Sequence, residues 1–153
     1  MDRATSPVVG VALLLALTVV AATAVGTAAL ALEPPSRPPV ASFSLTVDAD
    51  TDRLILRHRG GETVDTERVG LRVSVGGVPL EHQPPVPFFA ATGYRSGPTG
   101  PLNSGADPRW SAGERATLRL AGTNAPLPER GDRVTVRVVV DGASTGTLRA
   151  VAE

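Results

Sequence analysis

The 153-residue chain contains no cysteine and no lysine, and only 3% of its residues are aromatic. The absence of cysteine excludes disulfide bonds, thiolate metal sites, a cysteine nucleophile and anchoring through a lipidated cysteine. A domain exported without disulfides must be held together by packing, and valine and leucine must supply most of it. The formal net charge is zero, which argues against a general nucleic-acid binder, so no nucleic-acid partner is expected.

A long apolar run dominates the N-terminal part of the chain. No charged residue occurs between Ala4 and Leu32, and the strongly apolar part starts at Val8. A helix of about 25 residues, with ~1.5 Å rise per residue, spans ~37 Å and can cross a hydrocarbon core of ~30 Å. A cleavable secretion signal has an apolar region of only about 7–15 residues, so removal at Ala29-Leu30-Ala31 is the weaker alternative. Arg3 favours a cytoplasmic N-terminus, with the C-terminal part outside.

Small residues recur within the apolar run at four-residue spacing. Thr18, Ala22 and Gly26 share one face of the predicted helix, and so do Ala12 and Ala16. Small side chains at this spacing let helix backbones approach closely in lipid, which predicts packing against other copies of the helix. The general abundance of alanine in this chain explains the pattern equally well, and the residues alone do not separate the two explanations.

A helix start is predicted at Ser6 and Pro7. Proline at the first helical position leaves no N–H group unsatisfied, and its φ is already helical. Serine directly before it can cap the helix. The charged residues Asp2 and Arg3 therefore form a short leader that abuts the helix.

The residues from Asp2 to Val11 read Asp-Arg-Ala-Thr-Ser-Pro-Val-Val-Gly-Val. This run resembles the N-terminal signature of haloarchaeal type IV pilins and pilin-like proteins, in which a run close to Asp-Arg-Ala-Val-Ser-Pro-Val-Ile-Gly-Val begins the hydrophobic domain. The chain differs from that signature at Thr5 and Val9. It also lacks the glutamate that many bacterial pilins carry near the start of this helix.

The resemblance implies a class III signal with a leader of residues 1–4 and a hydrophobic pilin-type helix at 5–32. A prepilin peptidase would recognise Arg3, Ala4 and Thr5 and cut after Ala4, which makes Thr5 the new N-terminus. A cut one residue earlier, before Ala4, is the alternative. The helix would anchor the protein in membrane lipid and later bundle with other pilin subunits, with the pilus assembly machinery as a further partner. The implied role is structural, so neither enzymatic activity nor a cofactor is expected.

Residues 33–40 form a proline-rich connector, Glu-Pro-Pro-Ser-Arg-Pro-Pro-Val. Proline cannot continue a helix and favours extended polyproline II. The connector is therefore expected to be a semi-rigid spacer that holds the following domain away from the membrane or the filament axis.

From residue 41 to residue 153 the apolar pattern is that of strands. Gly76-Gly77 and Asp141-Gly142 are two-residue hairpin signals. About seven short alternating segments predict an all-β antiparallel, immunoglobulin-like sandwich outside the membrane, preceded by one long N-terminal transmembrane or filament-core α-helix. The expected strand segments are 43–47, 54–56, 69–75, 78–80, 116–120, 134–140 and 146–151.

Arginines alternate with the apolar positions of these segments, at Arg57, Arg72, Arg119 and Arg137. This spacing predicts that they lie on the solvent faces, where their charge would protect edge strands from aggregation. The segment 54–62 also resembles C-terminal domains of the pilin family, which often have a strand that ends in histidine before a Gly-Gly turn.

Residues 81–113 are rich in proline and glycine and hold four of the five aromatic residues. Such a segment is either an exposed contact surface or a flap that closes one end of the sandwich. Trp110 is expected to plug the core. The portion 93–106 is expected to be exposed, and the candidate contact loop for subunits or surfaces carries Phe88, Phe89 and Tyr94.

Metal chemistry has weak support in the sequence. Asp48-Ala49-Asp50-Thr51-Asp52 resembles the start of a calcium loop, but Arg53 and Arg59 stand where that loop needs glycine and glutamate. A solvated turn between two strands is therefore expected. His58 and His82 are the only imidazoles and are too few for a zinc site, so no metal site is expected.

Two functional hypotheses remain. The first is a type IV pilin-like subunit, major or minor, which is anchored in the membrane, assembled through its helix and displayed at the cell surface, where it would support adhesion. The second is a membrane-tethered, extracytoplasmic β-sandwich binding module that is not assembled into filaments. Arg3-Ala4 and the small-residue face of the helix are the features that distinguish them.

Overall fold

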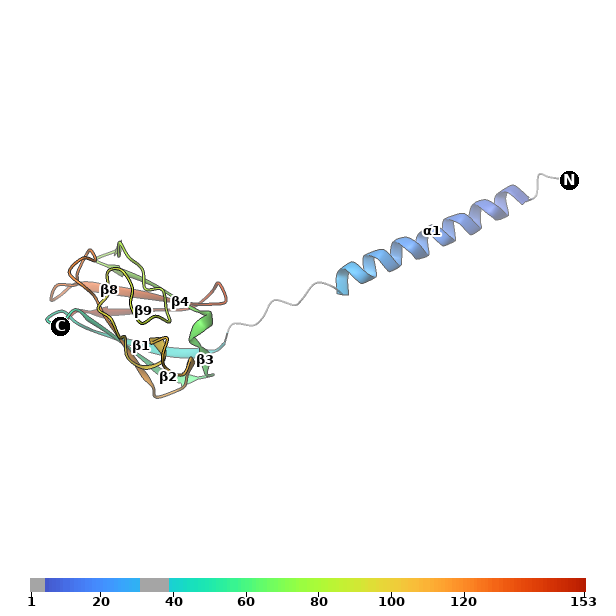
Figure 1. Ribbon diagram of the computed structural model, residues 1–153. Coiled ribbons are helices and arrows are strands. Elements are labelled where there is room, and N and C mark those ends of the chain that lie inside the picture. The colour runs from blue at the N-terminus through green and yellow to red at the C-terminus, as the bar shows by residue number, and fades with distance from the viewer. Residues whose placement is uncertain (1–4, 31–38) are drawn as a thin grey trace. The chain divides into compact units, whose positions relative to one another are not determined.

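The computed structural model describes residues 5–30 and 39–153. The chain divides into two compact units, Met1–Arg37 and Pro38–Glu153 (Figure 1). The first unit contains the single long helix, and the second contains the strands. The leader 1–4 and all of the connector except Pro39 and Val40 lie outside the described residues.

Helix α1 extends over Thr5–Leu30 and contains 26 residues, none of them charged. Pro7 lies in its first turn, where backbone N–H groups have no intrahelical partner, so the missing N–H of proline removes no hydrogen bond. Ser6 lies within this turn rather than ahead of it. The structure confirms the predicted apolar helix, and the last two residues of the expected range 5–32 lie outside the described residues.

The second unit is a sandwich of two antiparallel sheets that form two layers (Figure 1). The strand order is β1-β2-β7 in one sheet and β5-β4-β8-β9 in the other, with β3 and β6 paired separately. The first sheet contains β1 (Ala41–Asp48), β2 (Arg53–Gly61) and β7 (Arg115–Arg119). The second contains β4 (Val69–Val75), β5 (Val78–Pro79), β8 (Arg133–Val140) and β9 (Ala143–Val151). The short pair is β3 (Val64–Asp65) with β6 (Arg109–Trp110), and the 3₁₀ helices are η1 (Thr66–Arg68) and η2 (Gly100–Leu102).

This strand order is that of an immunoglobulin-like sandwich. In the usual lettering the first sheet corresponds to strands A-B-E, and the second sheet corresponds to strands C′-C-F-G. The predicted fold class is therefore confirmed. All seven predicted strand segments are present, and β3 and β6 are two further strands whose two-residue length left no periodic signal.

The core lies between the sheets and is built mainly from alternating valines and leucines. Along β4 and β8, every second residue is buried and its neighbours point outward. The two hairpins close as the sequence predicts, because both central residues adopt positive φ: 58° and 87° at Gly76-Gly77, and 51° and 79° at Asp141-Gly142. This is the backbone that a two-residue type I′ turn requires.

Both edges of the β1-β2-β7 sheet are partly covered by chain from elsewhere in the domain. The end of β1 is bonded to Glu153, whose N–H donates to the Val47 carbonyl at 3.1 Å and whose carbonyl accepts from the Ala49 N–H at 2.9 Å. The outer edge of β7 is covered by the segment 94–99, through isolated bridges to Leu120 and Thr117. Covered edges leave few free backbone groups for unwanted strand pairing.

Trp110 is fully buried, as predicted, and lies in β6 opposite Val64. Its ring is 4.8 Å from that of Phe43, and Phe43 is also 4.8 Å from the His58 ring. These three rings fill the end of the sandwich where β1 begins. A buried tryptophan removes a large apolar area from water, so this cluster is a major source of stability in a chain with few aromatic residues.

Candidate assembly surfaces

Helix α1 presents its entire circumference to the surroundings, because every side chain described in it, over residues 7–28, is exposed. Its segment Pro7–Ala28 contains 22 residues and is long and apolar enough to cross a membrane by length and composition. At ~1.5 Å per residue this segment measures ~33 Å, close to the ~30 Å of a hydrocarbon core. A helix of this kind is stable in lipid or inside a bundle of similar helices.

The hydroxyls of Thr18, Thr23 and Thr27 in α1 are satisfied within the helix. The hydroxyl of Thr18 donates to the Leu14 carbonyl at 2.7 Å, and that of Thr23 donates to the Val19 carbonyl at 3.0 Å. Thr27 bonds in the same way to the carbonyl of Thr23. Polar groups in hydrocarbon must find partners internally, so these threonines are compatible with a lipid environment.

The predicted small-residue face forms a broad sector of α1. At about 100° per residue, Thr18, Ala22 and Gly26 fall within ~80° of one another, and Ala12 and Ala16 occupy the adjoining sector. A Cβ atom built on Gly26 would meet nothing within 4 Å, so the chain itself leaves this face open. Packing of the face against another helix remains a prediction.

The processing residues are only partly within the described residues. Arg3 and Ala4 lie outside them, whereas Thr5 is the first residue of α1. The helix therefore begins at the residue that the expected cut would expose.

The candidate contact loop needs a correction. Phe88 and Tyr94 are each only 6% exposed, and their ring centroids are 5.4 Å apart. The Tyr94 hydroxyl donates to the His82 carbonyl at 2.8 Å, and burial raises the pKa of Tyr94. The expectation that these two rings are available for contacts was wrong, because the segment folds back as a flap over the core. Phe89, at 61% exposed, is the one aromatic residue of the three that remains at the surface.

Two hydrogen bonds between Val40 and Glu62 fix the point at which the connector joins the sandwich. The Val40 N–H donates to the Glu62 carboxylate at 2.8 Å, and the Glu62 N–H donates to the Val40 carbonyl at 2.9 Å. Gly61 has a φ of 101°, and a Cβ there would overlap the Val40 carbonyl. His58 is fully buried and donates from Nε2 to the Glu62 carbonyl at 2.9 Å. We call Val40, Gly61 and Glu62 the tether clamp.

Strand β2 does not end at His58, as the family resemblance implied, but continues through both glycines to Gly61. The His-Arg-Gly-Gly sequence at its end has a structural purpose. The glycine permits a close backbone approach that a side chain would prevent. The buried imidazole supports the clamp from inside the core, packed against Phe43 and Trp110.

The calcium-like run forms a tight turn between β1 and β2, as expected. The Asp48 carboxylate accepts hydrogen bonds from the N–H and hydroxyl of Thr51, and these bonds lower its pKa. Asp50 forms a salt bridge with Arg130, which lowers the pKa of Asp50. Among the described residues no group of three or more His, Cys, Asp or Glu could hold a metal ion.

One hydrolase-like pattern, Gly-x-Ser-x-Gly, occurs at Gly142–Gly146. In a nucleophile elbow this pattern joins a strand to a helix. Here it forms the β8–β9 turn and the first residues of β9. Ser144 therefore sits in a β-hairpin without the backbone that activates such a nucleophile.

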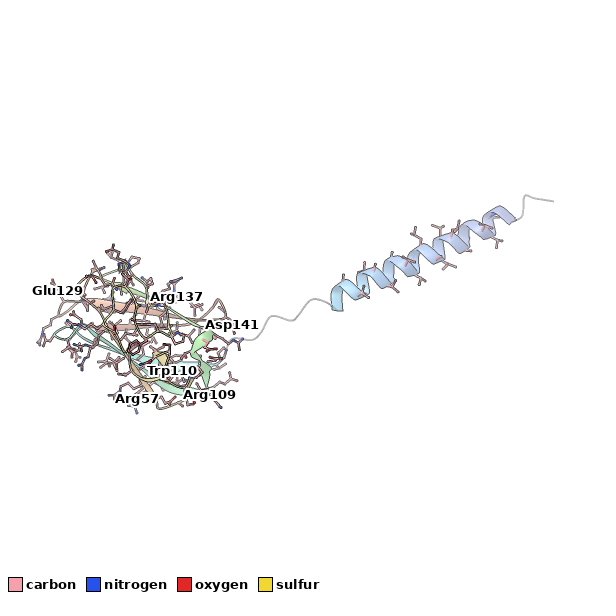
Figure 2. The ribbon with its side chains drawn as sticks, in the orientation of Figure 1. Arg57, Arg109, Trp110, Glu129, Arg137 and Asp141 are labelled. Carbon is pink, nitrogen blue, oxygen red and sulfur yellow. The ribbon has the colours of Figure 1, made fainter. Side chains whose placement is uncertain are left out.

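Arginines cover the outer faces of both sheets. Arg57, Arg72 and Arg137 are exposed, as predicted, whereas Arg119 is half-buried. Their expected role at edge strands was wrong for the first three, because β2, β4 and β8 each lie between two other strands. Arg57 of β2 and Arg137 of β8 lie on opposite sides of the domain (Figure 2). Edge protection therefore does not explain them.

A single apolar helix able to cross a membrane, followed by a β-sandwich, defines a class of membrane-anchorable subunits with a folded head domain. Residues 3–43 match the family model described as archaeal type IV pilin, N-terminal. This match confirms the family resemblance of the N-terminal region and supports a type IV pilin-like structural subunit rather than an enzyme. It covers α1 and ends in β1, so the rest of the sandwich lies outside it. No curated protein matches the chain.

Proposed function

We propose that the protein is a type IV pilin-like subunit that is cut by a prepilin peptidase after Ala4 and assembled through α1 into a surface filament. The observation that carries the proposal is the uncharged, fully exposed helix, which begins at Thr5 and lies within the family match to residues 3–43. Such a helix needs either lipid or other helices around it. A pilin helix occupies these two environments in turn.

The sandwich would be displayed outside the membrane. Arg3 favours a cytoplasmic N-terminus, which places everything after α1 on the other side. The tether clamp gives the domain a fixed attachment point at Val40. Exposed Phe89 is the residue of the contact loop that remains a candidate for adhesion or subunit contacts.

The experiment is the intact mass and N-terminal sequence of the full-length protein recovered from membranes and from sheared surface material. The expected mature protein starts at Thr5 and appears in both fractions, and a start at Ala4 would equally indicate prepilin-type processing. Arg3→Ser should abolish the mass shift, because it removes the charge next to the cut. Arg37→Ser removes the same charge beyond the helix and should be processed normally.

Each other outcome has a definite meaning. A start near Leu32 would identify an ordinary secreted domain and contradict the proposal. An intact Met1 or Asp2 start, with no sheared material, would favour the membrane-tethered binding module. Normal processing of Arg3→Ser would show that the cut is placed wrongly.

A further inference from the structure

The outer face of the β1-β2-β7 sheet carries an excess of positive charge. Its outward positions on β2 and β7 hold five arginines, whereas β1 adds hydroxyl groups and one carboxylate, that of Asp48, which lies opposite Arg53 at the end of the strand. The arginines are Arg53, Arg57, Arg59, Arg115 and Arg119. We call this surface the arginine face. The two salt bridges found in the described part of the chain, Arg68–Asp141 and Arg130–Asp50, involve none of these five.

Four of these arginines occupy directly opposed positions on the neighbouring strands β2 and β7. Arg57 lies directly opposite Arg115 in the β2–β7 register, and Arg53 lies directly opposite Arg119. Like charges directly opposite each other across two strands are destabilising. Arg119 is half-buried, and its Nε atom has no hydrogen-bond partner. A ligand with negative charge would relieve this repulsion and satisfy the free donor.

A shallow groove crosses the arginine face. It has a volume of about 260 Å³ and is lined by Ser44, Thr46, Ile55, Arg57, Arg59 and Arg115. Its lining contains no carboxylate. The groove therefore offers guanidinium and hydroxyl donors to an acidic loop.

The chain carries a surface of the opposite sign at one end of the sandwich. The β1–β2 turn contributes Asp48, Asp50 and Asp52. The turn at residues 129–132 lies beside the β1–β2 turn and is connected to it by the Asp50–Arg130 salt bridge. Glu153 lies there too, because its carbonyl accepts a hydrogen bond from the Ala49 N–H. We call this surface the acidic end. Its carboxylates are Asp48, Asp50, Asp52, Glu129, Asp132 and Glu153. The basic residue within the same segments is Arg130, so negative charge predominates there.

Two carboxylates of the acidic end, those of Asp48 and Asp50, have lowered pKa values and stay charged to lower pH than free aspartates. The hydrogen bonds from Thr51 lower the pKa of Asp48, and Arg130 lowers that of Asp50. Glu129 lies at the opposite end of the domain from Asp141 (Figure 2). The acidic end is thus a terminal feature of the sandwich, whereas the arginine face is a lateral one.

We propose that the arginine face docks the acidic end of a second copy of this chain. The inference rests on the proposed function, which supplies neighbouring copies. The contact joins the arginine face of one copy to the acidic end of the next. A joined pair therefore still has one free arginine face and one free acidic end, which can bind further copies. A heterologous contact of this kind extends into a ring or an open helical filament. The other sheet face has four arginines but one directly opposed pair, Arg72–Arg137, so it is the weaker candidate.

The absence of cysteine permits a clean test by disulfide cross-linking in sheared filaments of the full chain. Ser44→Cys places a thiol on the arginine face, and Thr51→Cys places one in the acidic end. The double variant should form a ladder of dimers, trimers and longer species under mild oxidation. Each single variant should remain monomeric, because each surface meets the other kind and not itself.

A disulfide within one chain cannot mimic this result. Ser44 and Asp48 are separated by four residues of β1, or ~13 Å at ~3.3 Å per residue, and Thr51 lies beyond Asp48. A disulfide requires Cα atoms within about 7 Å. Adding Arg57→Ser and Arg115→Ser should reduce the ladder about tenfold, whereas Arg109→Ser and Arg149→Ser remove equal charge elsewhere and should not.

A matched control tests whether the arginine face, rather than the other sheet, makes the contact. Thr135→Cys with Thr51→Cys places the first thiol on the outer face of β8 and should give no ladder. A ladder from that pair, or none from Ser44→Cys with Thr51→Cys in filaments that form normally, would overturn the inference and leave the proposed function intact. Loss of filaments in the wild-type chain would contradict the proposed function instead. Binding of dextran sulfate that depends on Arg57 and Arg115, without a ladder, would identify a polyanion as the partner and overturn the proposal.

Discussion

The helix and the sandwich differ in where their apolar side chains lie: exposed in the helix and buried in the sandwich. In α1 every described side chain is exposed, including the large residues Leu13, Leu14 and Leu15. In the sandwich the inward-facing valines and leucines of β4 and β8 are buried between two sheets. The sandwich therefore carries its stability within the chain, whereas the helix depends on lipid or on neighbouring copies.

The sharpest contrast is expected from deleting one large side chain in each region. Trp110→Ala should lower the free energy of unfolding of the sandwich by ~3–5 kcal/mol, because it empties a fully buried site. Leu14→Ala should leave that free energy unchanged, because Leu14 belongs to the other compact unit and its side chain is exposed. Denaturant titration of the sandwich signal in detergent-solubilised full-length protein measures both. An equal loss in the two variants would show that the regions are not energetically separate.

The glycines give a second contrast. Gly61→Ala should destabilise the sandwich by ~1–3 kcal/mol through its positive φ alone, and the overlap with the Val40 carbonyl adds to this cost. Gly10→Ala introduces the same methyl group where nothing lies within 4 Å, so thermal unfolding of the sandwich should not change. If Gly61→Ala unfolds at the wild-type temperature, the tether clamp tolerates a side chain and its tight geometry is not required.

The smallest change is expected in the helix, and it should be visible only in assembly. Ala22→Leu adds bulk to the small-residue face without reducing hydrophobicity. A loss of ~1.4 kcal/mol per contact corresponds to about tenfold weaker association, so filament recovery should fall about tenfold while membrane insertion stays intact. Val20→Leu is the matched control, because it introduces the same side chain at a position that is already large and lies outside the small-residue face. Unchanged filament yield for Ala22→Leu would show that this face does not pack.

The sequence is informative where side chains repeat with a period. The alternation along 69–75 and 134–140 predicts β4 and β8 to within a residue, because both strands have one buried face. The Gly-Gly and Asp-Gly dipeptides predict the hairpins, because few other residues adopt positive φ at both positions. The helix is equally clear, since its apolar run is uninterrupted.

The errors concern features that depend on long-range partners. Phe88 and Tyr94 lie in a segment without periodicity, so nothing local reveals that they turn inward against the core. The arginine positions predict outward side chains, but only the strand order shows that β2, β4 and β8 are interior strands. The opposition of Arg57 and Arg115 likewise depends on register, which the sequence of either strand alone does not contain.

The tether clamp also determines how the domain would respond to mechanical load. A pull on the connector enters the sandwich at Val40 and first stretches its two hydrogen bonds to Glu62. The next bonds in line are those of the β1–β2 ladder, beginning with the pair Ala41–Gly61. Force applied at this end would peel β1 away one pair at a time before it reached the ladder of β4 and β8. Strand β1 would then detach first under tension and add its length to the connector, while the larger sheet stays folded.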